Sequence, residues 1–190
     1  IWDAVNDPMV GMLSDRTRSE RWGRRYPWML WGAIPFGVTF LLQWLVPSFG
    51  TGEGNQWGLF FYYVVVGILF NSCYTAVNLP YTALTPELTT DYNERTSLNS
   101  FRFAFSIGGS ILSLILAGVI FKVVPDARQQ YLWLGGICAV FSTLPVFWCV
   151  FRTYRRTMAM TQLHPAADDE VSLPFLTQLK IAFSNRPFLY

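Results

Sequence analysis

Apolar residues are grouped along the chain in blocks, most of which have the length of membrane-spanning helices. Windows of high hydropathy predict five such segments, at residues 1–13, 28–46, 57–84, 98–124 and 131–150. We expect each to be a helix, because a backbone inside lipid must satisfy its own hydrogen bonds. The first segment rises only about 20 Å, against a hydrocarbon core of about 30 Å. We therefore expect the chain to be a fragment of a longer membrane protein.

The pattern becomes polar after the fifth segment. Residues 152–170 predict a polar linker, and residues 172–184 interleave apolar residues with Gln and Lys. Such a pattern is typical of a short amphipathic helix at the membrane interface. The prediction is a membrane part, residues 1–151, followed by a cytoplasmic part, residues 152–190, that leads to a further span.

Basic residues predict the orientation in the membrane. Residues 14–27 hold five arginines, and further arginines follow the third and fifth segments, whereas residues 47–56 contain no Lys or Arg. The positive-inside rule places the Arg-rich loops and residues 152–186 in the cytoplasm. We expect a multi-pass protein of the plasma or inner membrane.

Two carboxylates lie within the first apolar segment. Asp3 and Asp7 are four residues apart, which places them on one helix face about 6 Å from each other. Ionisable groups at membrane depth are costly and usually functional. Counting about 1.5 Å per residue from the inner helix ends puts Thr75 at the same level.

These positions predict a site for a small hard cation or a proton. Its oxygen-bearing side chains are Asp3, Asn6, Asp7 and Thr75, and oxygen ligands suit such ions. Asp3 and Asp7 would be the metal ligands if the ion is Na⁺. The alternative is that both aspartates are solvated at a cytoplasmic helix end.

Arg102 is the basic residue that lies one turn inside the fourth segment. Its side chain either extends to the membrane interface or faces inward. An inward guanidinium would bind substrate hydroxyls or a carboxylate.

Composition excludes several other classes of protein. Only 14% of the residues are charged, 52% are hydrophobic and the net charge is +2, which favours a membrane protein and gives nucleic-acid binding little support. The sole histidine, His164, falls in the predicted linker, and no nucleophile–base pair or metal-ligand spacing is present. We predict neither an enzyme nor a cofactor other than a coupling ion.

The loop after the first segment resembles the one between the second and third helices of the major facilitator superfamily. The resemblance is carried by Gly11-Met-Leu-Ser-Asp15-Arg16 followed by Gly23-Arg24-Arg25. It implies a cytoplasmic gate in which an aspartate at a helix end pairs with arginine across a moving interface. The residues assigned to this gate are Gly11, Asp15, Arg16, Arg24, Arg25 and, from the later loop, Arg95.

Longer stretches are similar to the glycoside–pentoside–hexuronide:cation symporters, the family of melibiose permease. They are Trp2-Asp3-Ala4-Val5-Asn6-Asp7-Pro8 and residues 22–28, 78–81 and 93–96. The resemblance implies an all-α polytopic membrane protein made of helices two to six of the N-terminal six-helix bundle of a twelve-helix facilitator, with the central loop that leads to helix seven. It also implies that Asp3 and Asp7 bind the cation, with Asn6 and Thr75 as accessory ligands, and that Arg102 lies at the sugar site.

Two positions depart from the family pattern. Asn78 stands where melibiose permease has an aspartate that binds sugar hydroxyls, and Thr82 stands where it has a tryptophan. Both stay candidate substrate-binding residues beside Arg102. The two changes indicate a substrate other than melibiose.

The expected function is secondary active symport. A monomeric carrier in the lipid bilayer would couple Na⁺ or H⁺ to the uptake of a glycoside or similar small polar solute by alternating access. Two alternatives stay open: a cation-coupled carrier of a non-sugar substrate such as a lysolipid, and a membrane scaffold or sensor that does not transport.

Overall fold

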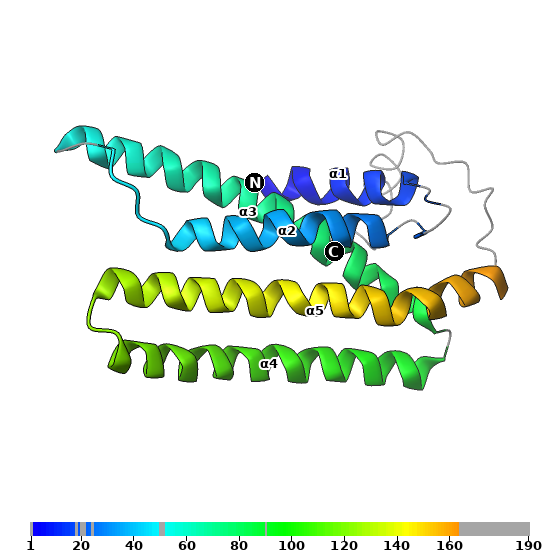
Figure 1. Cartoon of the computed structure of the whole chain (residues 1–190). Coiled ribbons are helices and arrows are strands. Elements are labelled where there is room, and N and C mark those ends of the chain that lie inside the picture. The colour runs from blue at the N-terminus through cyan, green and yellow to red at the C-terminus, as the bar shows by residue number, and fades with distance from the viewer. Residues whose placement is uncertain are drawn as a thin grey trace, which may run out of the picture.

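The computed structural model describes residues 2–17, 19, 22–23, 25–49, 52–89 and 91–163, apart from the side chains of residues 3–5, 53, 87, 158 and 160–163. These residues form five helices: α1 (Trp2–Arg16), α2 (Tyr26–Trp44), α3 (Glu53–Leu88), α4 (Tyr92–Val123) and α5 (Ala127–Leu163). In Figure 1, α1, α2, α5 and α4 follow one another from top to bottom, and α3 runs obliquely behind α2 and α5 from the side of α1 to the start of α4. The predicted amphipathic helix at residues 172–184 and His164 lie outside the described residues.

Three helices are long and apolar enough to cross a membrane, with candidate spans at Gly54–Pro86, Tyr92–Val123 and Ala127–Thr157. The shorter α2 has 19 residues, and α1 has 15. α5 continues to Leu163, so part of the predicted polar linker is helical. Hydropathy reports only the apolar part of a helix, whereas the backbone hydrogen bonds continue into polar sequence.

Local sequence explains the helix boundaries. Asp91 accepts hydrogen bonds from the backbone N–H groups of Asn93 and Glu94, at 2.6 and 3.2 Å, and so caps the start of α4. Gly23 has a φ of 71°, a conformation that glycine adopts without steric cost. It pairs with Ser19 through two backbone hydrogen bonds, which close the loop between α1 and α2.

α2 is the central helix of the described part, because it packs on both α3 and α5. Glycine permits a close approach to α5 at two levels. A Cβ atom at Gly135 would lie 2.6 Å from the indole ring of Trp44, and one at Gly37 would collide with Thr143. These contacts fix the packing of α2 against α5.

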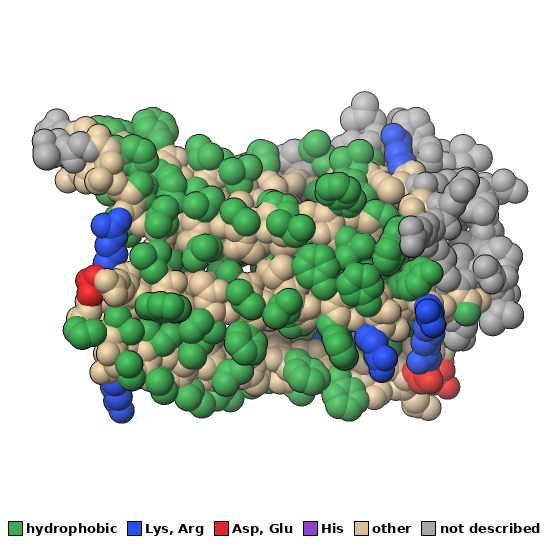
Figure 2. Space-filling model, viewed as in Figure 1, with side chains coloured by type: hydrophobic (Ala, Val, Ile, Leu, Met, Phe, Trp, Pro, Cys, Tyr) green, Lys and Arg blue, Asp and Glu red, His purple; other side chains and the backbone are tan. Residues whose placement is uncertain are grey.

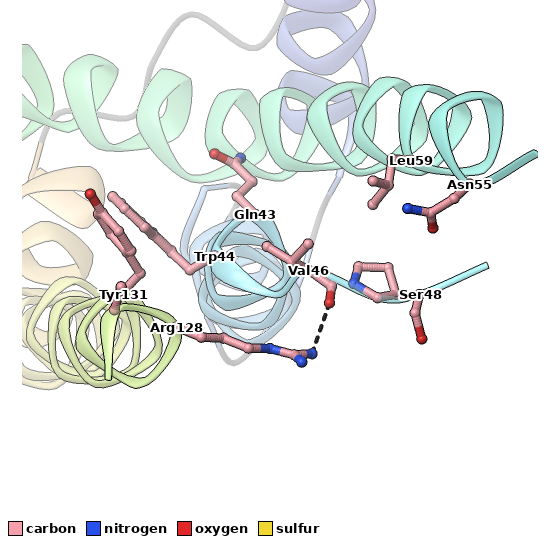
Figure 3. Close-up of a pocket in the computed structure, with 10 residues that line it drawn as sticks. Gln43, Trp44, Val46, Ser48, Asn55, Leu59, Arg128 and Tyr131 are labelled. Carbon is pink, nitrogen blue, oxygen red and sulfur yellow. Dashed lines mark hydrogen bonds between the residues drawn. The ribbon is translucent and has the colours of Figure 1, made fainter. Parts of the chain in front are cut away.

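The two ends of the bundle are held differently. At the end near the α1–α2 loop, Tyr26, Met29, Leu84 and Val150 form a buried cluster from α2, α3 and α5. At the opposite end, Arg128 Nη2 donates a hydrogen bond of 2.8 Å to the Val46 carbonyl and ties α5 to the segment after α2 (Figure 3).

Apolar side chains cover most of the visible surface, and charged side chains gather at its two ends (Figure 2). Phe105 on α4 is 78% exposed and Trp31 on α2 is 82% exposed. Such a continuous apolar surface is typical of a protein that faces lipid or other helices rather than water.

Candidate cation and substrate site

The contact between α1 and α3 brings two of the predicted cation-site residues together. Thr75 Oγ1 donates a hydrogen bond of 3.1 Å to Asp7 Oδ1. Thr75 is buried and Asp7 is exposed. A carboxylate has two oxygens that accept several bonds, so Asp7 can hold the Thr75 hydroxyl and bind a cation or proton as well.

A second hydrogen bond fixes how α1 lies along α3. Trp2 Nε1 donates to Ser72 Oγ at 3.1 Å, on the N-terminal side of the contact between Asp7 and Thr75. The two contacts advance in the same direction on both helices, so α1 and α3 run parallel. This arrangement is why residues nearly 70 positions apart share one level.

Asn6 precedes Asp7 in α1 and is buried. Its side-chain Nδ2 has no hydrogen-bond partner among the described residues. An unpaired buried amide is costly, and such groups deserve a functional explanation. The Asn6 side chain carries one acceptor oxygen and two N–H donors.

The described part of the predicted site holds one carboxylate, one hydroxyl and one amide. Asp3 belongs to α1 by its backbone, but its side chain lies outside the described residues. Among the described side chains, no group of three His, Cys, Asp or Glu is close enough to hold a metal ion. Carboxylate, hydroxyl and amide oxygens are hard ligands, which suit hard cations rather than the soft metals that thiolates bind.

Arg102 is directed toward α3. Its guanidinium carbon lies 4.8 Å from the centre of the Tyr81 ring, a cation–π contact. Tyr81 lies between the two other predicted substrate residues along α3, and Thr82 Oγ1 donates to the carbonyl of Leu79 at 2.9 Å. The geometry therefore brings Arg102 to the stretch of α3 that contains Asn78 and Thr82.

Tyr81 was missed by the analysis of the sequence. It lies within the motif at residues 78–81, but nothing in that motif shows that its ring meets a residue of another helix. The signal available in the sequence was that Tyr81 is an aromatic residue at about the same predicted membrane depth as Arg102.

Two of the predicted gate residues form an ion pair. Arg25 Nη2 lies 3.7 Å from Asp15 Oδ1, so these two are brought together across the α1–α2 loop. Arg24 lies outside the described residues, and Arg16 is exposed at the end of α1. A Cβ atom at Gly11 would meet nothing within 4 Å, so the described surroundings do not require glycine there.

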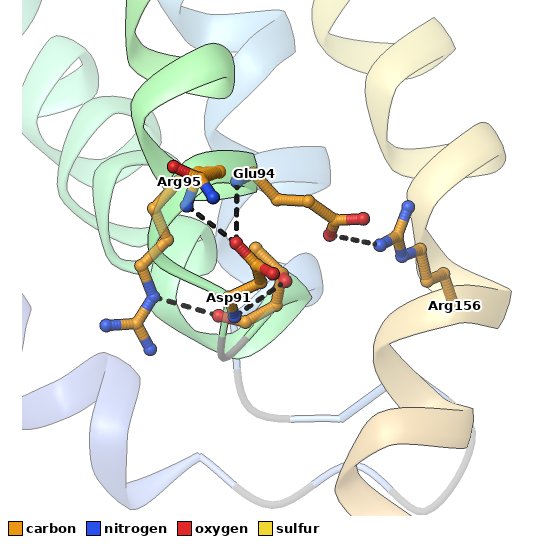
Figure 4. Close-up of polar contacts among 6 residues, drawn as sticks. Asp91, Glu94, Arg95 and Arg156 are labelled. Atoms are coloured by element: carbon orange, nitrogen blue, oxygen red, sulfur yellow. Dashed lines mark hydrogen bonds and ion pairs between the residues drawn. The ribbon is translucent and has the colours of Figure 1, made fainter.

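Arg95 makes a different contact from the Asp15–Arg25 pair. Its Nε donates to the Thr89 carbonyl at 2.9 Å and its Nη2 to the Pro86 carbonyl at 3.4 Å. It therefore caps the end of α3 from the first turn of α4 (Figure 4). Beside it, Glu94 pairs with Arg156 at 2.9 Å and joins α4 to α5, a contact that the sequence did not predict.

The family model described as MFS/sugar transport protein matches residues 1–190. The chain belongs to the glycoside–pentoside–hexuronide:cation symporter family of the major facilitator superfamily. Its members are transporters rather than enzymes, and the expected all-α polytopic membrane fold is confirmed.

Three relatives illustrate the range of proteins to which this chain is similar. An uncharacterized symporter from Synechocystis sp. is 61% identical over 154 residues, 80% of this chain and 28% of the relative. A putative glycoside/cation symporter from Escherichia coli is 35% identical over 158 residues, 82% of this chain and 33% of the relative. A sodium-dependent lysophosphatidylcholine symporter from Danio rerio is 37% identical over 119 residues, 63% of this chain and 21% of the relative. The chain thus spans a third or less of the length of each.

Proposed function

We propose that this chain forms the cation site and part of the substrate site of a symporter that couples Na⁺ or H⁺ to the movement of a glycoside. The observation that carries the proposal is the hydrogen bond between Thr75 and Asp7, which gathers a carboxylate and a hydroxyl from two helices. Asp3 would supply the second carboxylate from the same face of α1.

Ion binding and substrate binding would be coupled through α3. Thr75 contacts the cation site, and Tyr81 of the same helix carries the guanidinium of Arg102. An ion that orders the contact between α1 and α3 would favour one position of α3 and so favour substrate binding, which is linkage between two sites. Alternating exposure of the site would then complete transport.

The test follows intrinsic tryptophan fluorescence of the full-length carrier during titration with Na⁺, Li⁺ and protons. Trp2 is a suitable reporter, since its indole already bonds Ser72 next to the proposed site. We expect a saturable response to one of these ions. Asp3→Asn and Asp7→Asn should each abolish it while the protein remains folded.

The matched control is Asp126→Asn, which changes an exposed carboxylate before α5 and keeps an oxygen to cap that helix. It should respond like the unaltered carrier. An ion response that persists in both Asp3→Asn and Asp7→Asn would refute the proposed cation site and favour a solvated role for these aspartates.

A second candidate is cation-coupled transport of a lysolipid. It is favoured by the similarity to a sodium-dependent lysophosphatidylcholine symporter and by Asn78, an amide where a sugar-binding carboxylate is expected. Uptake of a labelled glycoside and of labelled lysophosphatidylcholine, each with and without the coupling ion, separates the two. Ion binding without uptake of any solute would instead favour the sensor.

A further inference from the structure

A pocket lies at the end of the bundle opposite the Asp15–Arg25 pair. It has a volume of about 510 Å³ and is bounded by the last turn of α2 with the segment that follows it, and by the first turns of α3 and α5 (Figure 3). None of the proposed cation or substrate residues lines it. The pocket is therefore separate from the transport site.

One wall of the pocket is aromatic and held firmly. The rings of Trp44 and Tyr131 stack with their centres 5.9 Å apart and their planes at 13°. Trp44 also packs directly on the backbone of Gly135, as shown by the short distance from a Cβ atom placed there. Leu59 and Val46 add apolar surface, so most of the lining suits a hydrocarbon group.

The rim of the pocket carries a positive charge. Arg128 is exposed, and its hydrogen bond to the Val46 carbonyl holds the guanidinium beside the opening (Figure 3). The carboxylate of Asp126 accepts the backbone N–H of Arg128 at 3.1 Å. Among the described side chains none forms an ion pair with Arg128, and no carboxylate lines the pocket.

The pocket also lies at the boundary of the membrane. The candidate spans of α3 and α5 begin at Gly54 and Ala127, and Asn55 and Ala127 line the pocket. Tryptophan and tyrosine concentrate at this level of a bilayer, and a guanidinium at this level is placed to meet the phosphate of a lipid head group. A ligand here would keep one end in hydrocarbon and the other at the aqueous surface.

We propose that this pocket binds the phosphate of an anionic phospholipid. Arg128 makes charge-assisted hydrogen bonds to the phosphate, for which a guanidinium is well shaped. The glycerol and the start of an acyl chain contact the rings of Trp44 and Tyr131. Because the described lining has no carboxylate to receive a choline or ethanolamine cation, phosphatidylglycerol binds better than phosphatidylcholine.

The test is native mass spectrometry of the full-length carrier in detergent, titrated with phosphatidylglycerol and phosphatidylcholine of identical acyl chains. We expect phosphatidylglycerol to be retained at lower concentration. Arg128→Gln should weaken this retention about tenfold, the effect of losing a charged hydrogen-bond partner, and Arg128→Lys should weaken it less. Tyr131→Leu should weaken retention of both lipids.

Lys122→Gln is the matched control, since it removes a cation at the same end of the bundle from a residue that does not line the pocket. It should retain phosphatidylglycerol as the unaltered carrier does. Thermal unfolding confirms that each variant is folded, including Arg128→Gln, which loses the hydrogen bond to the Val46 carbonyl.

Several outcomes would overturn the lipid site. They are equal retention of the two lipids, unchanged retention in Arg128→Gln, or an equal loss in Lys122→Gln, which would indicate only the general charge of the interface. Displacement of the lipid by inorganic phosphate or glycerol phosphate would indicate a soluble anion instead. Lipid binding does not depend on transport, so the result of the lipid titration stands even if the ion titration shows no response.

Discussion

At the scale of single residues, the contact between Thr75 and Asp7 carries most of the functional interpretation. Helical rise alone predicted that the hydroxyl and the carboxylate share one level, because depth depends only on the count of residues. The burial of Asn6 was not predictable, since it depends on how α1 is rotated against α3.

Thr75→Ala should weaken binding of the coupling ion. The hydroxyl fixes the Asp7 carboxylate, and hydrogen bonds to charged groups contribute about 1.5–3 kcal/mol. We expect the apparent dissociation constant for the ion to rise by about tenfold or more, and Thr75→Ser to restore much of the affinity. Ion titration of tryptophan fluorescence measures both.

The control for this substitution is Ser110→Ala, which removes a hydroxyl that bonds only to a carbonyl of its own helix α4 among the described residues. An unchanged ion affinity in Thr75→Ala would contradict the role given to this contact.

The ring of Tyr81 positions the Arg102 guanidinium, and this contact also belongs to the residue scale. Tyr81→Leu should raise the KM for substrate about 2–30-fold, because a cation–π contact is worth about 0.5–2 kcal/mol. Tyr81→Phe retains the ring face and should stay close to the unaltered carrier. Uptake kinetics that separate KM from kcat test this, and equal effects of Leu and Phe would count against it.

At the scale of helices, the order and number of elements were predictable from hydropathy, whereas their ends were not. α5 continues to Leu163 through polar residues. Part of the reason is tertiary: Tyr26 Oη bonds the hydroxyls of Thr153 and Thr157, at 3.1 and 2.6 Å. The hydropathy pattern of one segment carries no information about a hydrogen-bond partner that is more than 120 residues away in the sequence.

Close packing of α2 on α5 gives a prediction about two neighbouring glycines. Gly135→Ala should destabilise the carrier by about 1–3 kcal/mol, because the new methyl group would overlap the indole of Trp44. Gly136→Ala should be nearly neutral, since its Cβ atom would meet only Leu41 at 4.0 Å. Thermal unfolding in detergent compares the two variants, and equal midpoints would show that α2 and α5 do not approach so closely.

At the scale of the whole molecule, the charged ends predict how the protein lies in its membrane. Loop orientation follows from arginine placement rather than from packing, so it can be predicted from sequence but cannot be derived from the helix arrangement. The exposed ion pair of Glu94 with Arg156 holds α4 and α5 together at the end of the bundle near the Asp15–Arg25 pair, and such surface pairs contribute at most about 1 kcal/mol.

Labelling with a membrane-impermeant thiol reagent tests this orientation. Ser48→Cys should react in intact cells, because Ser48 is exposed in the loop without basic residues. Arg155→Cys should react only after the membrane is opened. The carrier with only its native Cys73, Cys138 and Cys149 supplies the background. The reverse pattern would invert the proposed topology.

The length of α3 has a mechanical consequence. Its 36 residues span about 54 Å, with Thr75 in its C-terminal half and Asn55 at the pocket near its N-terminus. Thr75 and Asn55 are separated by about 30 Å along the axis. If α3 pivots as a stiff lever about the level of Thr75, a tilt of about 10° displaces Asn55 by about 5 Å over that length. A spectroscopic distance between the Asn55 end of α3 and α5 would therefore change by several ångströms when an ångström-scale event occurs at Asp7, and such a change is readily measured.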